Sequence, residues 1–359
     1  MIYKKLLLVL PGVILAFVLY SLAQGFNNII GIELLGYEKS PISTAMIAIL
    51  IGIIFGNIFK MRTGFIIGLD FTQRYILKLG IIFLGIQLKP FEFLKFGTIA
   101  IPLIIICIIS VLIVIKLLIK KLKISTRMAY LISIGSTVCG TTAIMATAPI
   151  IKANKGEVTY AIANITVFGV ISMLLYPYLA NIYFNGEPLY VGLFLGTAIH
   201  ETSQVAAAGL IYDQQFNSPE TLNIATVTKL IRNTFLIIMI PLFAFLYNRG
   251  KTKEKDYSIL DIFPYFVLGF IGMIILRNVG DQFFLTGASK EIWQNTILNI
   301  KGSAKIFLSM AMAAIGLSAN LKDLRSIGYK PFVVGFIAML TVGLMSVLTM
   351  QSFTKLFLS

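Results

Sequence analysis

The chain has 359 residues, of which 58% are hydrophobic and 13% charged, and its mean hydropathy is +0.90. An ordinary soluble domain carries about 25% charged residues to face water, so this composition excludes a soluble globular protein. The formal net charge of +15 would indicate nucleic-acid binding in a soluble protein, but in membrane loops it is typical of the inside-positive rule. We therefore expect an integral membrane protein, with the lipid bilayer and not nucleic acid as its partner.

The composition also limits the chemistry that the chain can perform. A single histidine and a single tryptophan leave little material for metal or aromatic-cage sites. Both cysteines, Cys107 and Cys139, lie in apolar stretches, which does not favour a disulfide framework. The sequence contains no metal-ligand cluster, strand-linked phosphate loop or nucleophile elbow. We expect neither an enzyme nor a metal site.

Long apolar segments follow one another along the whole chain. A helix that crosses the hydrocarbon core needs roughly 20 apolar residues, and eleven segments approach this length. They are Leu6–Leu22, Ser43–Phe59, Thr72–Leu88, Thr98–Leu118, Met128–Ile151, Val158–Tyr183, Leu189–Tyr212, Thr221–Tyr247, Ile259–Leu276, Ile297–Leu317 and Pro331–Leu356. The sequence therefore predicts an all-α polytopic membrane protein with about nine to eleven transmembrane segments.

The first segment follows Lys4 and Lys5 in the manner of a secretory signal, but it lacks a small-residue cleavage site, so we expect a membrane anchor. No Gly/Ser linker separates the segments. We therefore predict one transmembrane transporter domain over residues 1–359. Its scaffold-like spans would cover 1–125 and 257–359, and its core 126–250.

Two of the segments are interrupted by polar and small residues. Met128–Ile151 contains the run Gly135–Thr142, and Leu189–Tyr212 contains the run Gly196–Gln204. Non-helical backbone at membrane depth persists only where protein buries it or where it lines a wet cavity. We predict two broken or re-entrant helices here; the alternative is close helix packing through small residues.

The two interrupted runs resemble each other. Residues 135–146 align with residues 196–207. Identical pairs are Gly135/Gly196, Thr141/Thr202 and Ala146/Ala207, and near-isosteric pairs are Ser136/Thr197, Val138/Ile199, Thr142/Ser203 and Ile144/Val205. A fainter echo pairs Gly85–Gly97 with Gly316–Gly328. Repeats in transporters are commonly inverted, with the binding site near the bilayer midplane at their interface.

Loop charges favour a topology in which both interrupted segments are hairpins and the amino terminus lies inside. The basic residues that this version places inside are Lys60, Arg62, Lys116, Lys120, Lys121, Lys123, Arg127, Lys152, Lys155, Arg249, Lys251, Lys253, Lys255, Lys322, Arg325 and Lys330. It leaves Glu187, Asp213 and Glu220 outside. Two broken helices that cross the membrane completely remain the alternative; they would move Lys152 and Lys155 outside.

Six ionisable residues fall inside the predicted spans: His200, Glu201, Lys229, Arg232, Lys301 and Lys305. A bare charge at the bilayer centre costs at least about 2.5 kcal/mol, so such residues pair or serve a function. Lys229 and Arg232 share one face of a helix that Ser218 and Pro219 are expected to start. For them the alternative is a structural ion pair with Glu201, or side chains that extend to the interface. For Lys301 and Lys305 we favour side chains that extend to the interface.

The opened segments and these cations together favour anion binding. Helix N-termini present unpaired N–H groups and favour negative charge, and Arg232 supplies a planar fork that matches oxyanions. The predicted substrate-binding residues are Ser136, Thr137, Cys139, Gly140, Thr141, Thr142, Thr202, Ser203, Gln204, Lys229 and Arg232. We expect Glu201, with His200, to carry a coupling proton or to complete a sodium site.

Four motifs, in the same order along nearly the whole chain, resemble a known family. Residues 138–153 are similar to its CGxSAIxAxxPVIxA stretch, 200–209 to HEVAQVVAAG, 229–232 to KLTR and 311–317 to AMAALGL. The chain thus resembles the YeiH-type sulfate exporter family. It departs from the pattern at Thr142, where serine is usual, and at Thr202-Ser203, which replace Val-Ala.

This resemblance implies a secondary transporter in the bacterial inner membrane with a cytoplasmic N-terminus. Similar inverted-repeat carriers move organic anions, bicarbonate or bile acids by an elevator or rocking motion, often with sodium. We therefore predict a carrier for a small anion such as sulfate, sulfite, a sulfonate or a small carboxylate. A passive anion channel or exporter and a non-transporting membrane scaffold or sensor are the alternatives, and a homodimer stays open.

Overall fold

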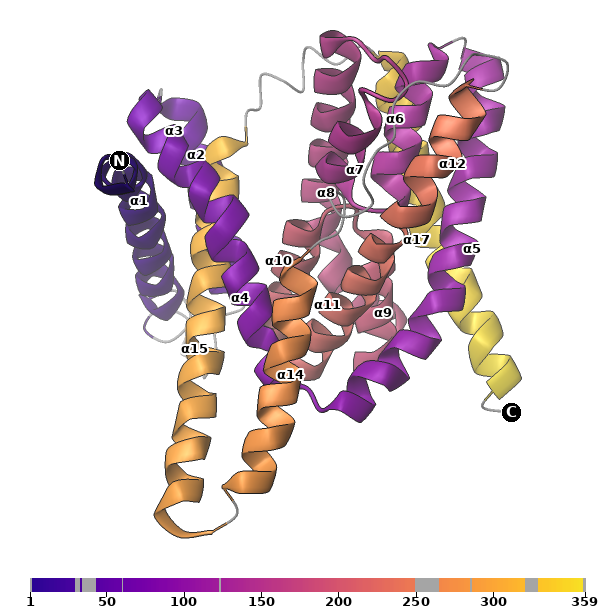
Figure 1. Ribbon diagram of the computed structural model, residues 1–359. Helices are drawn as coiled ribbons and strands as arrows, with labels where there is room; N and C mark the ends of the chain where they lie inside the picture. The colour runs from indigo at the N-terminus through magenta and orange to yellow at the C-terminus, as the bar shows by residue number, and fades with distance from the viewer. Residues whose placement is uncertain are drawn as a thin grey trace. The chain divides into compact units, whose positions relative to one another are not determined.

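The computed structural model describes residues 2–29, 33, 43–59, 61–122, 124–248, 265–284, 286–319 and 329–357. Within these ranges the chain is helical and has no β-strand (Figure 1). The basic loop residues Lys60, Lys123, Arg249, Lys251, Lys253, Lys255, Lys322 and Arg325 lie outside the described residues, as does part of the fainter repeat. The predicted all-α polytopic architecture is confirmed.

The chain divides into two compact units. Unit 1 comprises Met1–Leu94, Ala206–Asn223 and Tyr265–Leu321, and unit 2 comprises Lys95–Val205, Ile224–Pro264 and Lys322–Ser359. Three helices, α5 (Pro90–Leu122), α10 (Thr202–Phe216) and α11 (Pro219–Thr234), each contribute residues to both units. The predicted division into a scaffold and a core remains a prediction.

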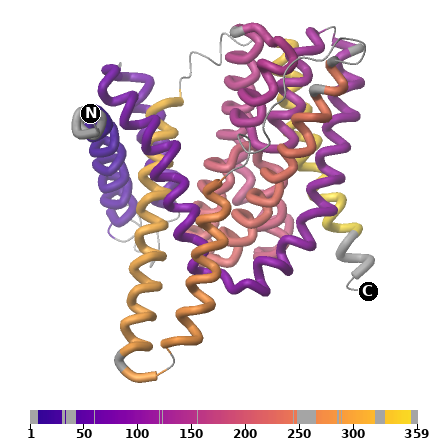
Figure 2. The backbone as a smooth tube through the Cα atoms, viewed as in Figure 1, coloured from indigo at the N-terminus to yellow at the C-terminus, as the bar shows by residue number. Residues whose placement is uncertain are grey.

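Unit 1 is built around one long helix, α15 (Gly287–Ser318), which packs on helices from the start of the chain. The other elements are α1 (Ile2–Asn28), α2 (Thr44–Ile58), α3 (Thr63–Phe71), η2 (Thr72–Ile76), α4 (Leu77–Leu84), η3 (Gly85–Gln87) and α14 (Phe266–Phe283). Glycines let backbones touch: a Cβ on Gly52 of α2 would lie 2.7 Å from the Ala313 carbonyl oxygen of α15. In Figure 2, α14 and α15 lie side by side as two arms of a helical hairpin.

Unit 2 contains both interrupted segments. Its helices are α5 (Pro90–Leu122), α6 (Thr126–Thr137), α7 (Gly140–Thr147), α8 (Lys155–Tyr183), α9 (Pro188–Ala198), α12 (Leu236–Asn248) and α17 (Tyr329–Phe357), with parts of α10 and α11. Helix α17 packs on α6, α8 and α9. Both predicted breaks are present, because α6 ends at Thr137 before α7 begins, and α9 ends at Ala198 before α10 begins.

Helices α6 and α7 form a hairpin that leaves the bundle on the side where it entered. They pack on each other, and a Cβ on Gly135 would meet the Ile144 side chain at 2.9 Å. The Ser125 hydroxyl, at the N-cap of α6, donates to Glu157 at the start of α8 across 2.7 Å. A segment that crossed a bilayer would separate these ends by about 30 Å. The first break therefore has the hairpin form that the loop charges favour, and not the form of a broken helix that crosses the membrane completely.

Helices α9 and α10 enter from the opposite side. Helix α8 has 29 residues and is thus about 43 Å long, so it carries the chain away from the Ser125 end. Gly196 of α9 faces Ala225 and Thr228 of α11, and the carbonyls of Thr197 and Ile199, further along the chain, accept hydrogen bonds from Arg232, further along α11. The two helices are therefore parallel and start on the same side. Since α11 begins just after α10 ends, the segment α9–α10 returns to the side on which it started.

A contact at the far end of α12 supports this path. The α11–α12 stretch runs from Pro219 to Asn248, and near its end Tyr247 accepts a hydrogen bond of 3.1 Å from Arg127 at the start of α6. The end of α12 therefore lies beside the start of the first hairpin, and Ile224, where this stretch begins within unit 2, lies away from it. The two hairpins point toward each other.

Seven described helices are long and apolar enough to span a membrane. They are Leu8–Asn28, Pro90–Ile119, Gly156–Tyr183, Pro219–Tyr247, Phe266–Phe283, Ser289–Ser318 and Tyr329–Ser352. Each corresponds to one predicted segment. The predicted segment Ser43–Phe59 is a shorter helix of 15 residues, and two other predicted segments are the hairpins. The predicted segment Thr72–Leu88 belongs to a helical run that begins earlier, at Thr63, and contains a π turn.

The predicted span Thr221–Tyr247 lies within the candidate span Pro219–Tyr247, but it has a turn that the sequence did not predict. The turn is at Phe235 between α11 and α12, where the Thr234 hydroxyl donates to the Ile231 carbonyl at 2.7 Å. One expectation about a loop was wrong. Asp213, expected in an outside loop, lies within α10, and its carboxylate is 2.8 Å from the ammonium of Lys305 on α15. Both residues belong to unit 1, and the interfacial position expected for Lys305 remains a prediction.

Candidate functional site

The candidate site lies where the tips of the two hairpins meet in unit 2. Here the C-terminal ends of α6 and α9 approach the same stretch of α11. The residues of α11 that face them are Lys229 and Arg232, which are 0% and 2% exposed. They lie three residues apart on one helix face, as the sequence predicts. Each cation contacts both hairpins.

Lys229 is bound by backbone carbonyl groups of both breaks. Its ammonium donates to the carbonyl oxygens of Val138 at 2.8 Å, Ile199 at 3.1 Å and His200. Three acceptors require three N–H donors, which only the protonated amine has. The three carbonyls thus match the three N–H donors that an ammonium group at Lys229 offers.

Arg232 bridges the same two helix ends. Its Nε donates to the Thr137 carbonyl at 2.7 Å, and one terminal nitrogen donates to the carbonyls of Thr197 at 2.6 Å and Ile199 at 3.0 Å. The other terminal nitrogen donates to the Ser136 carbonyl. The last carbonyls of a helix lack partners within it and carry partial negative charge. A buried guanidinium satisfies those of α6 and α9 together.

The two cations contact equivalent positions of the aligned runs. Lys229 binds the carbonyls of Val138 and Ile199, and Arg232 binds those of Ser136 and Thr197. Both pairs are aligned in the sequence comparison of residues 135–146 with 196–207. The similarity between the runs is therefore matched by similar backbone contacts.

On the other side of the breaks, a carboxyl group lies at the N-terminus of α7. Glu201 accepts a hydrogen bond from the Thr141 hydroxyl, and a Cβ on Gly140 would lie 3.2 Å from its carboxyl oxygen. Gly140 has a φ of +30°, a conformation that favours glycine. A residue of the second hairpin thus supplies a negative group where the first N–H groups of α7 favour one.

The start of α10 has a different set of neighbours. The Thr202 hydroxyl accepts a hydrogen bond of 3.0 Å from the Asn233 amide and lies 3.4 Å from the Cys139 thiol. Asn233 was missed by the sequence prediction. The spacing in the sequence could have predicted it, because Asn233 lies four residues after Lys229 and therefore on the same face of the helix.

His200 is buried, at 0% exposure. Neither imidazole nitrogen has a well-aligned hydrogen-bond partner among the described residues, although the Ser136 backbone lies close to the ring. The Ser136 hydroxyl likewise has no partner within the described chain. Buried polar atoms are usually satisfied, so these two side chains mark a place where a proton or water has acceptors or donors to bind.

The remaining predicted residues are more dispersed. The Thr137 hydroxyl donates to the Ser133 carbonyl of its own helix at 2.9 Å, and the Gln204 amide donates to the Thr166 carbonyl of α8 at 3.3 Å. Thr142 is exposed and Ser203 half-buried, and both lie in the first turns of α7 and α10. Of the predicted hydroxyl groups, those of Thr141 and Thr202 make hydrogen bonds at the hairpin tips, with Glu201 and Asn233.

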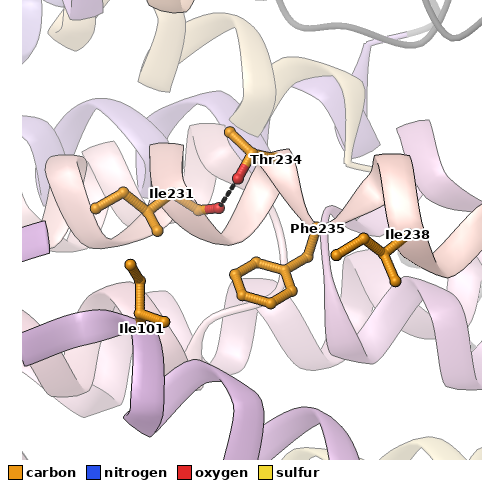
Figure 3. Close-up of a pocket in the computed structure, with 5 residues that line it drawn as sticks. All are labelled: Ile101, Ile231, Thr234, Phe235 and Ile238. Carbon is orange, nitrogen blue, oxygen red and sulfur yellow. Dashed lines mark hydrogen bonds between the residues drawn. The ribbon is translucent and has the colours of Figure 1, made fainter. Parts of the chain in front are cut away.

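A cavity of about 210 Å³ lies beside α11 (Figure 3). Its walls are Ile101, Ile231, Thr234, Phe235 and Ile238, and the Thr234 hydroxyl already donates to the Ile231 carbonyl. None of the predicted site residues lines it. An apolar wall of this kind does not fit a small anion. In the part of the chain that is described, no cluster of three histidine, cysteine or acidic residues is placed to hold a metal ion.

Fold and site together define a polytopic helical membrane protein in which two opposed hairpins meet at buried cations. The family model "Conserved hypothetical protein 698" matches residues 8–335. A UPF0324 membrane protein of Streptococcus agalactiae serotype V is 36% identical over 344 residues, which cover 96% of this chain and 97% of that protein.

Two further relatives carry the same family name. The UPF0324 membrane protein of Fusobacterium nucleatum is 35% identical over an alignment that covers 83% of this chain and 88% of that protein. The UPF0324 membrane protein of Clostridium tetani is 31% identical, and the alignment covers 95% of this chain and 96% of that protein. The chain belongs to the UPF0324 membrane protein family, and the family membership expected from its motifs is confirmed. No solved structure matches it.

Proposed function

We propose that this protein is a secondary transporter that carries a small anion across the bacterial inner membrane by alternating access. The observation that carries the proposal is the meeting of two opposed hairpins at Lys229 and Arg232. Discontinuous helices that meet at the midplane of a membrane are the usual way in which secondary transporters build a binding site.

The charge balance at the tips supports an anion as the substrate. Lys229 and Arg232 donate to backbone carbonyls, which are neutral dipoles, and one carboxyl group, Glu201, lies near them. Two cations and one carboxylate leave one excess positive charge. In a low-dielectric interior this charge acts over a longer range than in water, so it attracts a small anion, and the attraction increases when Glu201 is protonated.

The direct ligands of the anion are groups other than the two cations, because the Lys229 donors are committed to carbonyls. The N-termini of α7 and α10 offer unpaired helix N–H groups, and Thr141, Thr142, Thr202 and Ser203 add hydroxyl donors. The hydroxyl-rich shell suits sulfate, sulfite, a sulfonate or a small carboxylate. Glu201 lies at the N-terminus of α7, so an anion entering there displaces it or requires its protonation.

This competition suggests how transport is coupled. Glu201 takes up a proton as the anion replaces it at α7, and His200, the preceding residue in the chain, exchanges that proton. Alternating access follows from the opposed hairpins, since inverted repeats are pseudo-symmetric and can exchange conformations. The predicted orientation has the N-terminus in the cytoplasm, with Arg127 and Lys152 on the same side.

Uptake by purified protein in liposomes tests the proposal, with labelled sulfate, sulfite, taurine and small carboxylates as probes. We expect uptake of one of these anions to saturate with its concentration. An inward proton gradient should change the rate of that uptake. Glu201→Gln should remove the effect of the gradient, since the amide does not titrate. Linear, non-saturating flux would support a channel instead. The absence of uptake and of ligand-induced thermal stabilisation with every probe would support a scaffold.

A further inference from the structure

The arrangement around Lys229 is that of a cation-binding site. Its three acceptors are backbone carbonyls from two separate breaks in helices. Rings of backbone carbonyls bind monovalent metal ions by replacing their hydration shell. In transporters with discontinuous helices, unwound carbonyls and half-helix C-terminal ends commonly coordinate the coupling sodium ion.

We infer that Lys229 is a tethered replacement for a monovalent metal cation at the crossing of the two hairpins. The ammonium group lies 2.8 Å from the Val138 carbonyl oxygen and 3.1 Å from that of Ile199, and it has the charge of a sodium or potassium ion. Because it is covalently attached to α11, it fills this carbonyl cradle permanently. The crossing therefore takes no sodium or potassium ion.

The neighbouring contacts support the same role. Arg232 occupies the adjacent carbonyls of Ser136, Thr137 and Thr197, so the C-terminal ends of both α6 and α9 are neutralised by cations of the chain. Four of the contacts fall on two equivalent pairs of the aligned runs, Ser136/Thr197 and Val138/Ile199, as would those of an ion held between two repeats. Lys229 is 0% exposed, so its ammonium does not leave the cradle for water.

A consequence for the proposed transport follows, and this step alone rests on the proposed function. If the chain supplies the cation, anion uptake should proceed equally well in sodium and in choline media. The coupling ion would then be neither sodium nor potassium at the crossing. A proton that binds Glu201 is the remaining coupling ion at the hairpin tips. Deleting the lysine should create a need for an added cation.

Thermal unfolding of the purified full-length protein in detergent tests the inference without requiring transport. Wild type, Lys229→Ala and the control Lys301→Ala are compared in sodium chloride, potassium chloride and N-methylglucamine chloride at equal ionic strength. A ligand that binds the native state stabilises it in proportion to the logarithm of its concentration. We expect sodium or potassium to raise the Tm of Lys229→Ala by about 3 °C or more, with no such difference for wild type or Lys301→Ala.

Two results would overturn the inference. One is a sodium- or potassium-specific stabilisation of the wild type as large as that of the variant. The other is a Lys229→Ala protein that responds to no cation. If this variant does not fold in any salt, Lys229→Ser decides, since its hydroxyl adds an oxygen ligand to the three carbonyls. Absence of all anion uptake would contradict the proposed function and leave the thermal result intact.

Discussion

Each unit of the protein contains buried or half-buried cations on membrane helices, but the two units neutralise them in different ways. In unit 1, Arg277 pairs with Asp281 at 2.7 Å and Lys305 with Asp213 at 2.8 Å, all on unbroken helices. In unit 2, Lys229 and Arg232 have backbone carbonyls as their hydrogen-bond partners. A helix must be opened before its backbone is available as a partner, and both breaks occur at these contacts.

The difference determines the field that each cation creates. An ion pair is neutral at a distance, whereas a cation on carbonyl dipoles keeps its formal charge. Unit 1 therefore pairs its cations with carboxylates, once within α14 and once between α10 and α15, whereas the two basic groups at the hairpin tips of unit 2 contact neutral carbonyl dipoles. This is why we place the anion site at the tips, and why the same kind of substitution should have unequal consequences in the two units.

Arg232→Ala is expected to have the largest effect. It leaves the carbonyls of Ser136, Thr137 and Thr197 without this partner in a buried region, and each buried acceptor left unsatisfied costs about 1–3 kcal/mol. Thermal unfolding in detergent measures this loss. Liposome uptake of the transported anion should disappear as well.

The matched variant in unit 1 is Arg277→Ala. The side chains of Arg277 and Asp281 are 18% and 30% exposed, and Asp281 keeps the hydrogen bond from Trp293, so we expect a loss of about 1 kcal/mol or less. Equal losses for the two variants would show that carbonyl-bound and carboxylate-bound arginines are equivalent here. Unchanged uptake by Arg232→Ala would remove the anion-site assignment.

Gly196→Ala tests the packing that presents the carbonyls to α11. The new Cβ would lie 2.8 Å from the Ala225 carbonyl oxygen and 2.7 Å from a methyl group of Thr228. Since backbone has to shift, we expect a destabilisation of about 1–3 kcal/mol and slower uptake. Gly302→Ala on α15 is the control, because no heavy atom outside its own helix lies within 4 Å. It should stabilise by up to about 1 kcal/mol through helix propensity, as measured by thermal unfolding.

Much of this arrangement could be predicted from particular residues. The small polar runs at Gly135–Thr142 and Gly196–Gln204 predicted the breaks, because such runs weaken a membrane helix. Loop charge favoured hairpins, and the contact between Ser125 and Glu157 agrees for the first of them. The spacing of Lys229 and Arg232 placed both on one face.

The partners of these cations could not be predicted. Backbone carbonyls have no residue identity, so the sequence favoured Glu201 or a substrate as the counter-ion. The ion pair of Lys305 was not predicted either. The sequence placed Asp213 in a loop, whereas it lies within α10, where its buried carboxylate contacts Lys305. The interruption at Phe235 was also missed, because no glycine or proline marks it. The sequence thus indicated which charges are buried but not which acceptors would surround them.

Asp213→Asn is expected to have a moderate effect that is confined to unit 1. Its carboxylate is 4% exposed and the Lys305 side chain 43% exposed, so the lysine can turn to solvent when the pair is lost. We expect a loss of about 1–2 kcal/mol in thermal unfolding. Uptake should persist at a similar rate, because no charge at the hairpin tips changes. An uptake defect larger than the stability defect would mean that this ion pair takes part in transport.

Thr202→Val should have the smallest effect on stability and a clear effect on transport. The substitution is nearly isosteric and removes the hydroxyl that accepts from Asn233 at 3.0 Å, which costs about 1 kcal/mol. Thr341→Val on α17 is the matched control, since its hydroxyl donates to the Ile337 carbonyl of its own helix at 2.7 Å. Both variants should unfold within a few degrees of wild type.

Only Thr202→Val is expected to weaken uptake, because its hydroxyl lies at the start of α10, where we place the anion. The effect should appear as a higher KM for the transported anion, since a direct ligand is lost while the net charge stays the same. Arg232→Ala, in contrast, should abolish uptake at every anion concentration. If Thr202→Val and Thr341→Val transport equally well, the positive field of Lys229 and Arg232 attracts the anion to some other group, and Thr142 and Ser203 become the next hydroxyls to replace.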